Sequence, residues 1–369
     1  MTPLGQLSAA GVAVWLDDLG RHRLASGQLA ELVASHDVVG VTSNPSIFAA
    51  AIGDGSDYAD DLARLAREGA SPEDAVRELT TSDVRSACDV LAEVHHATQG
   101  RDGRVSLEVD PRLAADPAGT VRQAAELSAV VDRPNLFVKI PATPEGLPAI
   151  TETLGAGIAV NVTLIFSLSR YERVLDAWLA GLELAARNGH NLARLDSVAS
   201  FFVSRMDTAV DPLLDAHGSA AAADLRGRTA LANARLAYQH YEQMLAGDRW
   251  AQLSSLGARS QRPLWASTGT KDARYDDTRY VTGLVAPDTV NTMPYATLEA
   301  MSDHGSVTGD TVRGAYDDAR AVLTALTGLG IDYDSVVDQL EADGVLAFQR
   351  AWDQLLHSVA GALDRASGG

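Results

Sequence analysis

The chain has 369 residues, enough for one large α/β barrel or for two average domains. Its formal net charge of −19 argues against nucleic acid or an anionic membrane as the main partner, because both would be repelled. An anionic metabolite is still compatible with this charge if its pocket is locally basic. The single cysteine, Cys88, excludes a disulfide framework and a cysteine zinc cluster within one chain.

The first residues lack the basic start of a secretory signal and reach Asp17 early. No uninterrupted apolar run approaches the roughly 18 residues that a membrane helix requires. We therefore expect a soluble, cytoplasmic protein.

Short β-branched runs alternate with longer helical patterns along the whole chain. Several of these runs are apolar on both faces, as expected for parallel strands that helices cover. In chain order, the predicted strands span residues 12–17, 38–43, 104–110, 135–142, 157–166, 197–206, 262–268 and 280–286. The predicted helices span residues 58–67, 72–98, 117–131, 145–154, 170–188, 220–246, 308–326, 333–340 and 345–363.

Eight strands that alternate with helices indicate an α/β fold, a (β/α)8 TIM barrel. We expect residues 1–369 to form one such domain, with extra C-terminal helices over about 306–369. A doubly wound open sheet is the alternative, but neither a GxGxxG nor a GxxxxGK[ST] loop supports it.

Polar residues inside or just after the apolar runs are the candidates for chemistry, because catalytic groups of such barrels lie at the C-terminal strand ends. Strand alternation places the polar side chains of residues 104–110 on one face, and Asn161 and Thr163 are likewise two positions apart. Each residue alone is as compatible with a structural hydrogen bond as with function. The set comprises Asp17, Asn44, Glu108, Asp110, Lys139, Asn161, Thr163, Ser200, Arg205 and Ser267.

Lysine is scarce in this chain, since the 30 basic residues comprise 28 arginines and only Lys139 and Lys271. Arginine cannot replace an amine nucleophile. Lys139 lies in the apolar segment NLFVKIPA, where a charged ammonium is costly to bury, and this favours the free amine. A free amine can form a Schiff base with a ketone; the structural alternative is an ion pair with Glu108 or Asp110. Lys271 is equally compatible with amine chemistry and with no special role.

Six segments closely resemble the transaldolase family, over about residues 12–305. They are GVTSNPSIF (40–48), VSLEVDPRL (105–113), NLFVKIPAT (135–143), NVTLIFSLSRY (161–171), SFFVSRMD (200–207) and the region from WASTGTKD to APDTVNTMP. The TSNPSIF and VKIPAT segments are specific to this family and its small aldolase relatives. By this agreement in order and spacing, the chain is similar to the longer, bacterial type of transaldolase.

The resemblance implies a class I transferase of the non-oxidative pentose phosphate pathway that uses no metal and no cofactor. It would transfer a dihydroxyacetone unit from sedoheptulose 7-phosphate to glyceraldehyde 3-phosphate, giving erythrose 4-phosphate and fructose 6-phosphate. Lys139 would form the Schiff base and Asp17 would be the acid/base of carbon–carbon cleavage. Glu108 and Thr163 would hold a water for dehydration and hydrolysis of the intermediates.

The resemblance also implies a set of substrate-binding residues. The dihydroxyacetone hydroxyls would bind Asn44, Asn161 and Ser200, and Phe202 would form an aromatic wall. The phosphate would bind Arg205 and Ser267. In shorter transaldolases the Ser267 region continues as S-F-R-N, with a second phosphate-binding arginine, whereas here Thr-Gly-Thr-Lys follows, so Lys271 is the candidate replacement.

Two alternative functions stay open from the sequence. One is a related aldolase that forms the same Schiff base and releases free dihydroxyacetone. The other is a non-catalytic barrel that binds sugar phosphates, since barrels carry many functions. We expect small sugar phosphates as partners, a monomer or homodimer, and no metal, because no HxH or HExxH pattern occurs.

Overall fold

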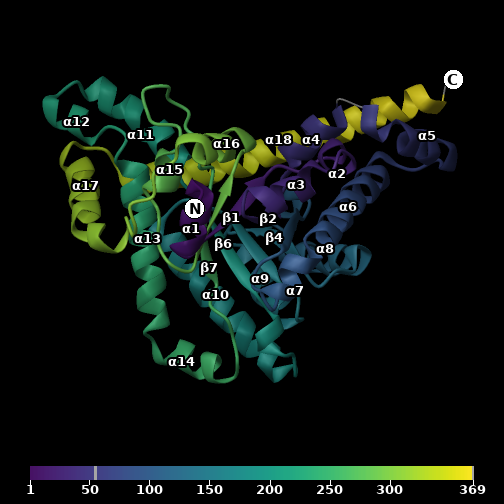
Figure 1. The fold of residues 1–369 in the computed structure, drawn as a ribbon, viewed down its shortest axis with the longest axis horizontal. Helices are drawn as coiled ribbons and strands as arrows, with labels where there is room; N and C mark the ends of the chain where they lie inside the picture. The colour runs from purple at the N-terminus through teal and green to yellow at the C-terminus, as the bar shows by residue number, and fades with distance from the viewer. Residues whose placement is uncertain (54–55, 368–369) are drawn as a thin grey trace.

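Eight short buried segments form the strands of a closed parallel barrel, in which each strand pairs with its neighbours in chain order and β1 pairs with β8 (Figure 1). The computed structural model describes residues 1–53 and 56–367. The strands are β1 (Val12–Asp17), β2 (Val38–Thr42), β3 (Arg104–Glu108), β4 (Leu136–Pro141), β5 (Val160–Ile165), β6 (Ser197–Phe202), β7 (Arg262–Ala266) and β8 (Thr289–Met293). The predicted (β/α)8 TIM barrel is thereby confirmed.

Helices surround the barrel and cover its outer face. Those of the first half of the chain are α1 (Pro3–Ala9), α2 (Arg21–Ala25), α3 (Gln28–Ser35), α4 (Pro45–Gly53), α5 (Ala59–Glu68), α6 (Pro72–Val90), α7 (Ala92–Ala97), α8 (Pro117–Val131) and α9 (Gly146–Gly155). Those of the second half are α10 (Leu168–Arg187), α11 (Ser204–His217), α12 (Ala220–Leu225), α13 (Thr229–Leu245), α14 (Asp248–Ser255), α15 (Arg279–Thr282), α16 (Tyr295–His304), α17 (Tyr316–Gly328) and α18 (Tyr333–Ser367). Among the residues that the structure describes, no helix combines the length and apolarity needed to cross a membrane.

The predicted eighth strand is wrong. Residues 280–286 comprise most of the short helix α15 and the turn after it, and the last barrel strand is β8, Thr289–Met293. Apolarity pointed to the wrong segment because Tyr280 and Val281 are buried helical residues outside the barrel wall. By contrast, β8 buries Thr289, Asn291 and Thr292, so its polar residues concealed a fully buried strand.

Two predicted helices are interrupted and two others are joined. Residues 72–98 form α6 and α7, which meet at Leu91, and residues 220–246 form α12 and α13, separated by an Arg226–Arg228 turn. Conversely, the predicted helices 333–340 and 345–363 are one continuous helix, α18, because Gly344 does not break it. Residues 368–369 of the predicted C-terminal region lie outside the described residues.

The long helix α18 crosses the barrel end at which the strands terminate (Figure 1, yellow), where it packs against α4 and α5. Gly344 brings the helix close to β5. A Cβ built on this glycine would lie 3.2 Å from Leu164 Cδ2 and from Phe166 Cε2. The C-terminal helix is therefore part of the wall around the barrel mouth.

A large aromatic side chain inside the barrel depends on a glycine beside it. Trp15 on β1 is paired in register with Gly40 on β2 and is fully buried. A Cβ built on Gly40 would lie 2.4 Å from Trp15 Cε2, so any side chain there would displace the indole.

We expect Gly40→Ala to lower the free energy of unfolding by about 1–3 kcal/mol, the typical cost of overpacking a core. Gly328→Ala is the matched control, because its Cβ would meet nothing within 4 Å at the end of α17, and it should be neutral or stabilising. Urea denaturation measures both. Equal stability of the two variants would contradict the close packing of Trp15 on Gly40.

Candidate active site

The barrel register places three polar side chains of neighbouring strands at one level. Glu108 on β3 is paired with Lys139 on β4, and Lys139 is paired with Asn161 on β5. Side chains at paired positions of neighbouring strands point to the same side of the sheet. The pattern of alternation noted in the sequence thus brings an amine, a carboxyl and an amide together near the C-terminal barrel end.

Lys139 is 4% exposed, and its amine meets one neutral partner. The Nζ atom donates a hydrogen bond to the backbone oxygen of Ser43 at 3.0 Å. Glu108 Oε2 lies 4.0 Å from Nζ, beyond hydrogen-bond distance. Asp110, the other ion-pair partner considered from sequence, instead binds Arg112 at 2.7 Å. The amine is therefore held in place without a close carboxylate partner.

Asp17 faces the main cavity at the end of β1 and is otherwise enclosed by protein. Its Oδ1 accepts a 2.6 Å hydrogen bond from Thr42, whose hydroxyl is also 2.7 Å from that of Thr292. Burial raises the pKa of Asp17, an effect that Lys139 and Thr42 partly offset. The carboxyl is thereby suited to take up and release a proton.

A second hydrogen-bonded chain links side chains of β3, β5 and β6. Ser200 Oγ donates to Asn161 Oδ1 at 2.7 Å, and Asn161 Nδ2 donates to Ser106 Oγ at 3.0 Å. The network fixes the Asn161 amide in one orientation. Thr163, two positions further along β5, is fully buried, and its hydroxyl has no hydrogen-bond partner within the described part of the chain.

A cavity of about 630 Å³ opens at this end of the barrel. Its volume suits a phosphorylated sugar. Of the residues predicted from sequence, it is lined by Asp17, Asn44, Lys139, Ser200, Phe202, Arg205, Ser267 and Lys271. Most of the predicted substrate-binding residues therefore share one cavity.

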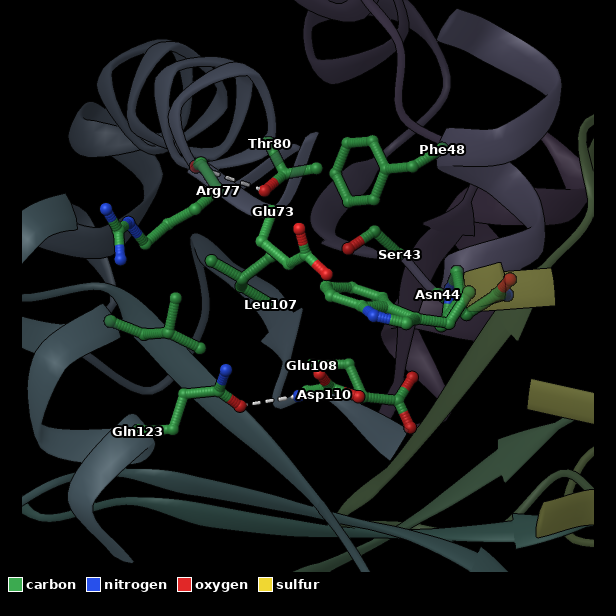
Figure 2. Close-up of a pocket in the computed structure, with 13 residues that line it drawn as sticks. Ser43, Asn44, Phe48, Glu73, Arg77, Thr80, Leu107, Glu108, Asp110 and Gln123 are labelled. Atoms are coloured by element: carbon green, nitrogen blue, oxygen red, sulfur yellow. Dashed lines mark hydrogen bonds between the residues drawn. The ribbon is translucent and has the colours of Figure 1, made fainter. Parts of the chain in front are cut away.

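The remaining predicted residues are not part of the lining of this cavity. Asn161 and Thr163 are fully buried, and Glu108 lines a separate side cavity of about 110 Å³. Figure 2 shows this side cavity, with Glu108 and Asp110 on β3 and the following turn, near Ser43 and Asn44. Asn44 lines both cavities, so it lies on the boundary between them.

The Glu108 carboxyl is buried with neither oxygen hydrogen-bonded to a described residue. Burial is the main reason that its pKa is raised, to about 7, and the nearby Lys139 partly offsets the increase. A carboxyl with this pKa is protonated in part of the molecules at neutral pH. It is therefore able to act as an acid or as a base beside the amine.

Two cationic side chains line the cavity in addition to Lys139. Arg205 lies in the first turn of α11, and Lys271 is exposed in the loop after β7. Ser267, which lines the same cavity, adopts a left-handed backbone with φ of 55°, and its hydroxyl lies 3.0 Å from that of Ser204. An anionic group in the cavity would meet positive charge here, in a chain that is otherwise strongly acidic.

Several lining residues were not predicted from the sequence. Thr42 and Thr292 orient Asp17, and Thr292 lies on the strand that the sequence analysis misplaced. Phe348 of α18 and Tyr295 of α16 form part of the wall. Phe348 is far in the sequence from the strand residues that line the same cavity, and no local pattern distinguishes it from an ordinary buried helical residue.

Comparison with known proteins gives a consistent result. The sequence pattern of the transaldolase/fructose-6-phosphate aldolase family matches residues 14–359. The chain belongs to this family. It is 60% identical to transaldolase 1 of Streptomyces coelicolor, over 98% of this chain and 95% of the relative. It is also 60% identical to the transaldolase of Thermobifida fusca, over 97% of this chain and 98% of the relative. The transaldolase of Renibacterium salmoninarum is 56% identical, over 99% of this chain and 98% of the relative.

Membership in the transaldolase/fructose-6-phosphate aldolase family agrees with the resemblance seen in the six sequence segments. The match extends to residue 359, well into α18, so the C-terminal helix belongs to the shared pattern. Within residues 1–53 and 56–367, no three His, Cys, Asp or Glu side chains are grouped so that they could hold a metal ion.

The raised pKa of Glu108 predicts a pH-dependent difference in stability between the wild-type chain and Glu108→Gln. As pH rises through the range between the unfolded pKa and about 7, the folded wild type keeps a proton that the unfolded chain releases, so its stability falls. Glu108→Gln has no ionisable group at this position, so its stability does not fall for this reason. We expect its stability relative to wild type to increase by about 2–3 kcal/mol from pH 5 to pH 8.

Urea unfolding at several pH values measures this difference in stability. The pH-dependent contributions of the other carboxyls are common to both proteins and cancel in the comparison. Glu126→Gln is the matched control, since Glu126 is exposed on α8. A flat difference between wild type and Glu108→Gln would mean that Glu108 ionises normally.

Proposed function

We propose that this chain is a transaldolase of the pentose phosphate pathway, an enzyme that transfers a three-carbon dihydroxyacetone unit between sugar phosphates. The donor is sedoheptulose 7-phosphate and the acceptor glyceraldehyde 3-phosphate; the products are erythrose 4-phosphate and fructose 6-phosphate. The observation that carries the proposal is the buried amine of Lys139, which meets a neutral carbonyl in a sugar-sized cavity. The names of the relatives at 56–60% identity support it.

The first step of the proposed mechanism joins the amine to the donor. Lys139 Nζ attacks the C2 ketone and forms a carbinolamine, which loses its hydroxyl as water and becomes an iminium ion. Glu108 supplies the proton for the departing hydroxyl, since its pKa near 7 leaves it partly protonated. The unpartnered hydroxyl of Thr163 is proposed to help hold the water.

The second step breaks the C3–C4 bond of the donor. Asp17 takes the proton of the C4 hydroxyl, C4 becomes an aldehyde carbon, and the bonding electron pair moves into the iminium to form an enamine. The aldose product leaves. The enamine carbon then attacks the aldehyde of the acceptor, Asp17 returns its proton to the new hydroxyl, and water hydrolyses the imine to free Lys139.

The remaining side chains are proposed to bind and orient the substrate. Asn44, Asn161 and Ser200 would hold the dihydroxyacetone hydroxyls, and the Ser106–Asn161–Ser200 chain supports a fixed amide orientation. Phe202 would form an apolar wall. Arg205, Ser267 and Lys271 would bind the phosphate, with Lys271 in the place of a second arginine.

A fructose-6-phosphate aldolase activity is the second candidate, because the family description includes it. Such an enzyme releases free dihydroxyacetone without an acceptor. Product analysis separates the two: a transaldolase forms erythrose 4-phosphate in quantity only when glyceraldehyde 3-phosphate is present. Steady release of dihydroxyacetone without an acceptor would favour the aldolase.

Incubation with fructose 6-phosphate and borohydride should fix a three-carbon adduct on Lys139, detectable by peptide mass mapping. Lys139→Arg should fold normally and lose activity, because a guanidinium keeps the charge but is not a nucleophile here. Lys271→Arg is the matched control and should still give the adduct. An active Lys139→Arg protein, or an adduct confined to Lys271, would rule out this mechanism.

Arg205 and Asp17 should affect different kinetic constants. Arg205→Ala should raise the KM for phosphorylated donors about 10–100-fold, equivalent to about 1.4–2.7 kcal/mol, with little effect on unphosphorylated donors. Asp17→Asn should lower kcat by about 10²–10⁴-fold with little change in KM, since proton transfer is needed in the transition state. Steady-state kinetics on both donor types distinguishes these outcomes. An equal loss on both donors in Arg205→Ala would show that the arginine is structural.

A further inference from the structure

A basic cavity of about 220 Å³ lies at the N-terminal end of the barrel, opposite the candidate active site. Its position follows from the residues that line it. Arg104 begins β3, whereas Glu108 at the other end of the same strand lies beside Lys139. Arg194, Pro134 and Arg259 lie in the segments that lead into β6, β4 and β7. The two cavities are therefore separated by the length of the barrel strands.

The residues around this lower cavity carry no negative charge. They are His95, His96, Gln99, Gly100, Arg104, Pro134, Arg194 and Arg259. Three guanidinium groups thus surround one small space in a chain whose formal net charge is −19. A carboxylate oxygen of Asp196 lies 3.8 Å from one of them, Arg104, so the three groups together keep an excess of positive charge that favours an anion.

Arg104 is 1% exposed, and its side chain is incompletely satisfied. Its Nη1 donates to the backbone oxygen of Pro134 at 2.9 Å, while its Nε has no hydrogen-bond partner among the described residues. Asp196, the nearest carboxylate, is 3.8 Å from Nη2, too far for a hydrogen bond. A buried guanidinium that is not fully hydrogen-bonded can bind a further acceptor.

The carboxylates near the lower cavity are engaged by other arginines. Asp196 binds Arg101 at 3.0 Å, and Asp288 also binds Arg101, at 2.6 Å. Asp102 binds Arg262 at 2.8 Å. These ion pairs engage Arg101, Arg262 and one oxygen of Asp196. The other oxygen, Asp196 Oδ2, makes no hydrogen bond within the described residues and is the carboxylate oxygen nearest to Arg104.

Arg259 and Arg194 add charge that no described carboxylate neutralises within 4.0 Å. Arg259 Nη2 donates to the backbone oxygen of Gln99 at 2.7 Å, but its Nη1 is buried without a partner in the described part of the chain. Arg194 is exposed at the edge. Burial, together with the positive charges of Arg104 and Arg259, lowers the pKa of His95 to about 4, so its ring is neutral and able to donate one hydrogen bond.

The nitrogens of three of these side chains converge beside Gly100. This residue has φ of 88°, in the left-handed region that favours glycine. A Cβ built on it would lie 3.2 Å from His95 Nε2 and 3.7 Å from both Arg104 Nη2 and Arg259 Nη1. The absence of a side chain at position 100 keeps the space between the three donors open.

We propose that this lower cavity is a second anion site, which binds the phosphate group of inorganic phosphate or of a small phosphate ester. Arg104, Arg259 and His95 donate hydrogen bonds to the phosphate oxygens around Gly100, and Arg194 adds charge at the entrance. Guanidinium groups match phosphate oxygens in geometry and charge. The volume admits phosphate or an ester of about three carbons, not a nucleotide.

The test is isothermal titration calorimetry with inorganic phosphate and, separately, with glycerol 3-phosphate. The protein carries Arg205→Ala and Lys271→Ala, so that the proposed phosphate-binding residues of the upper cavity do not contribute. In this background we expect one binding site, whose affinity for the anion falls as salt is added. Tighter binding of one probe identifies whether free phosphate or an ester is the preferred ligand.

Adding Arg259→Ala to this background should weaken binding at least tenfold, and Arg194→Glu, which changes an exposed side chain, should weaken it several-fold. The second variant keeps the test valid if the first fails to fold. Arg122→Ala is the matched control, since Arg122 is exposed on α8, and it should bind as the background does.

No binding of either probe up to on the order of 10 mM, about 2.7 kcal/mol of binding free energy, would overturn the proposal. So would equal binding with and without Arg259. These results would not affect the proposed transaldolase function, which depends on the other barrel end.

Discussion

The burial of one amine beside a neutral carbonyl oxygen is the interaction on which the rest of the candidate active site depends. Lys139 Nζ donates to the Ser43 backbone at 3.0 Å, and the nearest carboxyl oxygen, on Glu108, is 4.0 Å away. The Glu108 carboxyl thus lies near the amine without a direct hydrogen bond to it.

The barrel produces this arrangement through strand register. Paired positions bring Glu108, Lys139 and Asn161 to one level, and Asp17 is paired with Thr42 on the other side of the barrel mouth. Burial raises the pKa of both carboxyls, which are on different strands and face different cavities. Two acids with separate access to the lysine suit the separate proton transfers of imine formation and carbon–carbon cleavage. The same strand β3 carries Arg104 at its other end, where the charge is of the opposite sign.

Much of this arrangement could be predicted from the sequence, because strand alternation and the scarcity of lysine are local properties. Together with the resemblance to transaldolases, they identified the barrel, Lys139 and eight of the residues that line the main cavity. The eighth strand was misplaced because polar residues that point into a barrel look like a loop in the sequence. Glu108 was expected in the same site as the sugar-binding residues, but whether a strand-end side chain faces one cavity or its neighbour depends on packing. Phe348 and Gly344 of α18 were not identified, since the approach of Gly344 to β5 and of Phe348 to the main cavity depends on how a distant helix crosses the barrel.

The two lysines of this chain permit a direct test of its central claim by nitrogen NMR. Protein labelled with ¹⁵N at the lysine Nζ atoms should give two side-chain signals, which Lys139→Arg and Lys271→Arg assign. On addition of fructose 6-phosphate, the account predicts that the Lys139 signal moves from the amine to the imine region, while the Lys271 signal stays in the amine region. If both signals stay in the amine region at saturating donor, or if Lys271 alone forms the imine, Lys139 is not the Schiff-base residue.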